Sequence, residues 1–98
     1  MKKQIIRTNI DTLLFDVNFY DDKNIYELSE NELSKFIDLY NHGEQLPKVL
    51  LISGNTAFDN LSGDCFEEDF ETREQAVQYL YGMSYEDIMK NHDDDLSL

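Results

Sequence analysis

Residues 47–55 read Pro-Lys-Val-Leu-Leu-Ile-Ser-Gly-Asn, and their centre, residues 48–52, contains a short apolar run. A run of this length, closed by Gly54 and Asn55, is typical of a β-strand that is buried on both faces. A strand with both faces buried is expected in the middle of a sheet, where other elements cover it on either side. We therefore predict that residues 48–52 form the central strand.

The segment that follows predicts two further strands. Residues 56–60 and 65–70 flank the turn-rich tetrapeptide 61–64, so with the central strand they would form a three-stranded antiparallel meander. In this arrangement Phe66 and Phe70 would face the core. The same two residues are four positions apart, so an alternative is that the next helix begins earlier.

Two strands are also expected before the central one. Between Thr12 and Tyr20, apolar residues occupy alternate positions, which is the signature of a half-buried strand. These alternating residues are Leu13, Phe15, Val17 and Phe19. Residues 4–8 are a weaker strand candidate, and Asn9-Ile10-Asp11 could turn one strand into the other as a hairpin.

A helix is predicted over residues 30–41. Residues 29–32 read Ser-Glu-Asn-Glu, which is a capping box, and Leu28 before the cap can pack on Leu33. An amphipathic stripe with the spacing i, i+3, i+4, i+7 follows, and Gly43 is placed to end the helix. The stripe consists of Leu33, Phe36, Ile37 and Tyr40.

Two helices are predicted near the carboxyl end. Residues 72–75 form a second capping box, with an apolar face behind it and Gly82 at its end, and Ser84 can start a third, short helix. The fold class is therefore α+β, with the order ββ-α-βββ-α-α: a small antiparallel sheet with helices packed on one face. Residues 1–91 would be a single domain, and residues 92–98 an acidic C-terminal tail.

The charge of the chain excludes several functions. It has 98 residues, of which 21 are acidic and 8 basic, so its formal net charge is −13. Residues 1–48 carry a net charge of −3 and residues 49–98 carry −10. Direct binding to nucleic acid or to an anionic membrane is disfavoured, because both need clustered Lys and Arg. With one cysteine and no apolar leader or membrane-spanning run, a cytoplasmic location is expected.

The residue types used in catalysis do not form a recognisable centre. Cys65 follows Asp64 and precedes further carboxylates, which raise a thiol pKa and oppose its use as a nucleophile. His42 and His92 lie at predicted helix ends, where capping is the favoured role. Residues 59–64 resemble an acidic calcium loop, but their ligand spacing is wrong. We therefore predict no enzyme, no cofactor and no metal site.

The densest run of negative charge is the candidate binding surface. Between residues 59 and 74 the acidic side chains are opposed by Arg73 alone. On a strand that continued to residue 71, Glu67, Asp69 and Glu71 would project from one face about 6.6 Å apart. Such a row resembles successive phosphates of a nucleic acid, whereas Glu68 would point to the opposite face. The predicted contact residues are Asp59, Asp64, Glu67, Asp69, Glu71 and Glu74.

Residues 58–70, followed by the capped helix that ends at Gly82, resemble a pattern in small acidic accessory proteins of bacterial phages and mobile elements. The similarity covers about a quarter of the chain. That class includes anti-restriction and anti-CRISPR inhibitors, some of which present carboxylates in place of DNA phosphates. The resemblance implies a non-enzymatic inhibitor whose partner is a basic nucleic-acid-binding protein, such as a host nuclease or a restriction or CRISPR enzyme.

Two alternatives remain open from the sequence. The carboxylates can simply keep a small protein dissolved, as charged runs usually do. The chain can also be a protein–protein adaptor that docks through apolar contacts, with Tyr79, Tyr81 and Tyr85 as candidate residues. A monomer or a weak dimer is expected, because a strand at the sheet edge, such as residues 12–20, could pair two copies.

Overall fold

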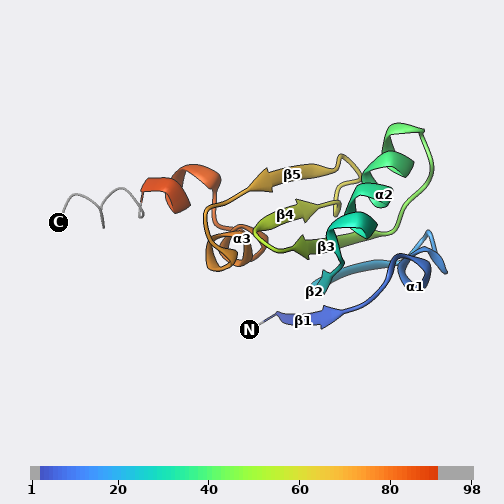
Figure 1. Cartoon of the computed structure of the whole chain (residues 1–98), viewed down its shortest axis with the longest axis horizontal. Coiled ribbons are helices and arrows are strands. Elements are labelled where there is room, and N and C mark those ends of the chain that lie inside the picture. Colours follow the sequence, from blue (N-terminus) through green and yellow to red (C-terminus); the bar gives the residue numbers. More distant parts are fainter. Residues whose placement is uncertain (1–2, 91–98) are drawn as a thin grey trace.

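β3 (Lys48–Ser53) is the middle strand of a five-stranded sheet whose strand order follows the chain, β1-β2-β3-β4-β5. The structure is a computed structural model that describes residues 3–90 (Figure 1). The other strands are β1 (Gln4–Arg7), β2 (Tyr20–Glu27), β4 (Thr56–Asp59) and β5 (Phe66–Asp69). The helices are α1 (Ile10–Leu14), α2 (Glu30–Asn41), α3 (Arg73–Leu80) and a further helical turn over 85–90.

The α+β class is confirmed, and so is the predicted order of the elements except for α1, which lies between the first two strands. The sheet is mixed rather than antiparallel. β1, β2 and β3 pair in parallel, and only β3, β4 and β5 form the predicted antiparallel meander. Parallel neighbours need a crossover of about a dozen residues or more. The connections 8–19 and 28–47 provide such crossovers and carry α1 and α2.

The alternating pattern over residues 12–20 does not form a strand, and that prediction was wrong. Asn9 caps a short helix instead: its Oδ1 accepts the backbone N–H of Thr12 at 2.8 Å. Ile10 and Leu13, which are three positions apart, are buried by this helix. The start of α1 therefore replaces the predicted hairpin over residues 9–11. The Asn9 cap and the two buried side chains stabilise the helix more than the alternating pattern stabilises a strand.

Helices cover both faces of the sheet, which corrects the prediction of a single covered face. One core cluster joins α1 and α2 to Val49, Leu51 and Phe58. The other joins α3 and the 85–90 helix to Leu50 and Ile52. Successive side chains of a strand point to opposite faces, so β3 contributes to both clusters and is buried on both sides, as predicted.

α2 and α3 begin and end where the sequence predicts. Ser29 accepts the N–H of Glu32, and Gly43 follows the helix with a positive φ of 78°. Glu32 also reaches outside its own helix, because its Oε2 accepts the N–H of Ile10 at 2.9 Å and so ties α2 to the start of α1. Thr72 and Gln75 form the second capping box in full.

The predicted third short helix is present as residues 85–90. Ser84 caps it, since its Oγ accepts the N–H of Asp87 at 3.2 Å, and Ile88 is buried against the α3 face. The predicted tail, residues 92–98, lies outside the described residues.

Candidate binding surface

β5 lies at one edge of the sheet (Figure 1). Its acidic side chains point to both faces, because successive residues of a strand alternate between them. Glu67 pairs with Phe58, whose side chain lies in the core under α2, so Glu67 points to the α2 face. Asp69 pairs with Thr56 on the same face, and its Oδ1 accepts the Thr56 hydroxyl at 2.7 Å. Both carboxylates are exposed, and their Cα atoms are about 6.6 Å apart because they are two strand positions apart.

These two carboxylates line a groove of about 480 Å³ between the first turn of α2 and the β3–β4 turn. Glu30, at the start of α2, is the third acidic residue of this groove. The rest of the lining is mostly small and polar, with two apolar side chains from α2. It consists of Leu33, Ser34, Ile37, Ser53, Gly54, Asn55 and Thr56. The groove can accept cationic or hydrogen-bonding groups of a partner.

The predicted row of three carboxylates is one residue too long. β5 ends at Asp69, so Glu71 lies past the strand and is not aligned with Glu67 by the strand repeat. Its backbone N–H donates to Gln75 Oε1, and its C=O accepts the side-chain N–H of Asn55, each at 3.1 Å. The strand ends here because the backbone N–H groups of Glu71 and Thr72 donate to Gln75 in the capping box of α3.

Asp59 and Glu68 lie on the opposite face, close to α3. Glu68 pairs with Ala57, which belongs to the core under α3, so Glu68 points to the α3 face and is half-buried there. Burial raises the pKa of Tyr79, and the negative charges of Glu68 and Asp59 raise it further. The side chain of Asp59 also accepts the N–H of Leu61 at 2.9 Å.

The remaining predicted contact residues are exposed but scattered. Asp64 lies in the β4–β5 turn, where its carboxylate accepts the hydroxyl of Ser62 at 3.3 Å. Glu74 lies in the first turn of α3, where a negative charge is favourable at the positive end of the helix. Of the six predicted residues, the structure therefore brings Glu67 and Asp69 together in one groove.

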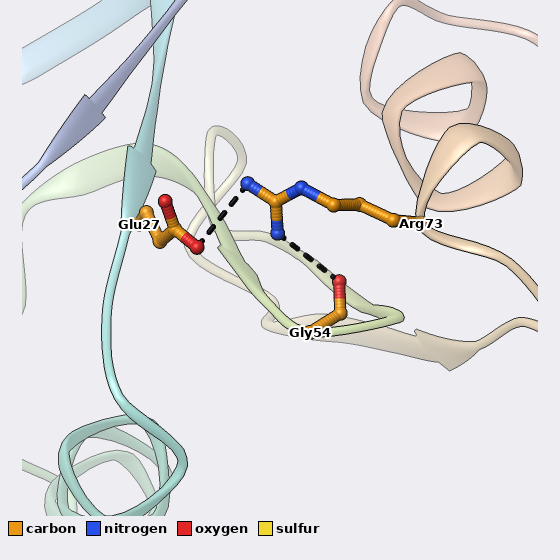
Figure 2. A network of polar contacts seen from close by, with 3 residues as sticks. All are labelled: Glu27, Gly54 and Arg73. Carbon is orange, nitrogen blue, oxygen red and sulfur yellow. Dashed lines mark hydrogen bonds and ion pairs between the residues drawn. The ribbon is translucent and has the colours of Figure 1, made fainter.

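Arg73, the one basic residue of the stretch 59–74, is oriented toward the middle of the sheet. Figure 2 shows its guanidinium between Glu27 of β2 and the β3–β4 turn. One nitrogen is 3.2 Å from a carboxylate oxygen of Glu27, and another donates to the carbonyl of Gly54 at 3.3 Å. These contacts tie the start of α3 to the end of β2 and to the β3–β4 turn.

Phe66 corrects a prediction, since its side chain is 53% exposed, whereas Phe70 is buried in the core under α3. Sequence reasoning also missed Glu30 as a groove residue, because it lies outside the acidic stretch 59–74. Of the tyrosines predicted as contacts, Tyr79 is half-buried against Phe70, at a ring distance of 5.5 Å, and so is not an exposed contact. Tyr81 and Tyr85 are exposed, as the adaptor hypothesis requires.

Cys65 and His42 occupy structural positions. Burial raises the pKa of the Cys65 thiol to about 12, with a smaller contribution from the charge of Asp64. The thiol donates to Oδ1 of Asn60 at 3.1 Å, and Asn60 is itself buried. His42 is the C-cap of α2, with Nδ1 2.6 Å from the Asp38 carbonyl, whereas His92 lies outside the described residues.

Residues 3–90 contain no group of three or more His, Cys, Asp or Glu side chains placed to hold a metal ion. Within the same residues, no helix is long and apolar enough to cross a membrane. Comparison of the chain with protein-family models, with curated proteins and with solved structures gives no match. The candidate surface is therefore argued from its own geometry.

Proposed function

We propose that this chain is a non-enzymatic acidic binding protein that inhibits a basic nucleic-acid-binding enzyme by occupying its groove. The observation that carries the proposal is the pair Glu67 and Asp69, exposed on one face of an edge strand with Glu30 across the same groove. A basic groove built for a nucleic-acid strand attracts such spaced carboxylates as it attracts phosphates. The resemblance of residues 58–70 to acidic phage accessory proteins is consistent with this role.

The charge distribution supports an electrostatic mode of binding. Residues 49–98 carry a net charge of −10, and their acidic strand β5 lies at the sheet edge farthest from β1. A concentrated field of one sign accelerates association with a partner of the opposite sign and makes it depend on salt. The partner would therefore be a cationic protein.

The protonation state of Cys65 argues against one catalytic role, that of a thiolate nucleophile. A thiol whose pKa is raised to about 12 is protonated at neutral pH, and the thiolate is the nucleophilic form. The half-buried position of this thiol and its hydrogen bond to Asn60 fit a structural residue.

A salt-dependent capture followed by a competition assay tests the proposal. The wild-type protein is immobilised, exposed to bacterial lysate, and washed at low and then high salt. A nucleic-acid enzyme that elutes as salt rises is then purified, and duplex DNA is used to compete with the protein for it. The proposal requires that DNA and the protein exclude one another, because both would occupy one groove.

A matched pair of charge reversals makes the assay specific to the groove. Glu67→Lys with Asp69→Lys should abolish binding of the captured enzyme. Asp22→Lys with Glu44→Lys changes the net charge equally at two exposed positions outside the groove and should leave most of the binding. If both variants lost binding equally, the effect would come from net charge alone and not from the groove. Unchanged binding in the groove variant would refute the proposed surface.

A second function, that of an adaptor which docks by apolar contact, has one observation in its favour. Tyr81 and Met83 are exposed and line a shallow groove of about 570 Å³ beside α3, together with Val77. An apolar interface should resist the high-salt wash that releases an electrostatic one. Salt-resistant capture that Tyr81→Ala removes would favour this function over the first.

A further inference from the structure

β1 presents an open backbone edge whose free groups can be assigned residue by residue. The N–H of Thr8 donates to the carbonyl of Glu27 on β2 at 3.0 Å. The backbone groups of successive strand residues point to opposite sides, so those of Gln4 and Ile6 also point toward β2. The backbone N–H and C=O groups of the residues between and before them point outward; these residues are Lys3, Ile5 and Arg7. β1 is the last strand on its side of the sheet, so these outward groups face away from it.

The first of these outward residues is already capped. The hydroxyl of Tyr81 accepts the N–H of Lys3 at 2.9 Å and donates to the carbonyl of Lys3 at 3.0 Å. One side chain thus takes both backbone groups that a neighbouring strand would use at this position. Within the described residues, the open edge of β1 is limited to Ile5 and Arg7.

β5, at the opposite edge, has the same arrangement. The N–H of Phe70 donates to the carbonyl of Asn55 on the inner side at 3.0 Å, which places the backbone groups of Glu67 and Asp69 on the outer side. The next outward residue is Glu71, whose N–H and C=O bind Gln75 and Asn55. Each edge therefore offers two open residues beside one capped residue, which precedes them on β1 and follows them on β5.

From this match we infer that the chain associates head to tail with a second copy of itself, β1 of one copy pairing antiparallel with β5 of the next. In this register Ile5 lies opposite Asp69 and Arg7 lies opposite Glu67, so that four backbone hydrogen bonds form. The two capped residues, Lys3 and Glu71, fall at the same level and end the ladder together.

Charge selects this pairing over the two symmetric ones. Lys3 and Arg7 are the charged residues of the β1 edge, and Glu67, Glu68 and Asp69 are those of β5. Pairing β1 with β1 would bring cations together, and pairing β5 with β5 would bring carboxylates together; like charges across strands are destabilising. Only the unlike edges place Arg7 opposite Glu67, and neither side chain has an ion pair within residues 3–90.

The geometry also fixes how the copies are oriented. Ile5 pairs with Ile25 of the α3 core, so Ile5 and Arg7 point to the α3 face, whereas Glu67 points to the α2 face. Cross-strand partners share a face, so each successive copy is turned over. The contact is heterologous and leaves one open β1 and one open β5 at the ends, so assembly continues beyond a dimer. This association does not depend on the proposed binding of a basic partner, but both use Glu67 and Asp69, so the two would compete for β5.

Sedimentation velocity of the purified chain, from micromolar to millimolar concentration, tests the inference. The expected result is a weight-average mass that rises with concentration past that of a dimer. Arg7→Glu and Glu67→Arg should each weaken association about tenfold, because an attractive cross-strand pair becomes a repulsive one. The double variant R7E/E67R should restore it, and so should an equimolar mixture of the two single variants.

A backbone variant tests the edge itself. Ile5→Pro removes an outward N–H and leaves the hydrogen bonds to β2 in place, which is the position where an edge strand tolerates proline. It should fold, as judged by circular dichroism, and remain monomeric. A monomer at all concentrations in the wild-type chain would overturn the inference. Association that Arg7→Glu strengthens and Glu67→Arg leaves unchanged would also overturn it, since the loss of facing cations would strengthen a symmetric β1 dimer.

Discussion

Replacing Phe36 with alanine should remove a large part of the stability of the fold. The Phe36 side chain is fully buried, and its ring meets that of Phe58 edge-on at a centroid distance of 5.5 Å, which joins α2 to the sheet. A Phe→Ala change in a core costs about 3–5 kcal/mol, out of a total of about 5–15 kcal/mol for a domain. In a domain of this size the melting temperature should fall by at least about 12 °C.

Phe15→Ala is the matched control, because it deletes the same atoms from a side chain that is 93% exposed. A surface substitution of this kind should change the free energy of unfolding by no more than about 0.5 kcal/mol. The comparison also tests the helix α1 against the strand predicted over residues 12–20, in which Phe15 would have faced the core with Leu13.

Urea unfolding followed by far-ultraviolet circular dichroism measures both variants, since the chain has no tryptophan. The midpoint should shift strongly for Phe36→Ala and hardly at all for Phe15→Ala, with a similar slope in both cases. Equal losses would mean that Phe15 belongs to the core and that α1 is wrong. A loss below about 1 kcal/mol for Phe36→Ala would contradict the described core.

Three further predictions concern single groups. Thr72→Ala should cost about 1 kcal/mol of unfolding free energy by removing the α3 cap, whereas Thr72→Ser should be nearly neutral in the same urea assay. Burial raises the pKa of Asp21, but the hydrogen bonds it accepts, foremost from Tyr26, outweigh this and leave the pKa below the usual 3.8. The ionised Asp21 carboxylate therefore contributes its full stabilisation above pH 3.8, and this contribution is lost as the pH falls through the lower pKa of the folded state. In urea unfolding at successive pH values, the stability of Asp21→Asn should fall less steeply with acid than that of the wild type. Cys65 should react with a thiol reagent at pH 8 at least about a hundredfold more slowly than free cysteine, and urea should abolish the difference.

The central and carboxyl-terminal parts of the fold were predictable because their signals are local. The apolar run of β3, the capping residue Ser29 and the capping box of Thr72 each act within a few residues, and the structure has all three where predicted. The β4–β5 turn is equally local. Signals of this kind depend little on what the rest of the chain does.

The amino-terminal part was mispredicted because two periodicities overlap there. Leu13, Phe15, Val17 and Phe19 alternate, but Ile10 and Leu13 also have helical spacing, and Asn9 supplies a cap. The parallel pairing of β1 with β2 then follows from the crossover through α1, which local alternation does not indicate. Choosing between the two required knowing that α2, although itself predicted, would pack against Ile10 and Leu13.

The candidate surface was predictable in composition but not in shape. Charge counting located Glu67 and Asp69, and the strand repeat placed them on one face. The same reasoning could not show that the strand would stop before Glu71, since that depends on how the α3 capping box takes over the backbone. Nor could it bring in Glu30, which reaches the groove from a helix far away in the sequence.

The contact between Tyr81 and Lys3 joins two residues that are 78 positions apart, and this separation sets an order of events during synthesis. The first strand leaves the ribosome long before the residue that caps it. Until Tyr81 has been made, the outward groups of Lys3 stay open beside those of Ile5 and Arg7, and unpaired strand edges of this kind are what partly folded chains aggregate through. A nascent chain therefore has a longer unpaired strand edge than the folded protein. The edge becomes shorter once Tyr81 has been translated and caps Lys3.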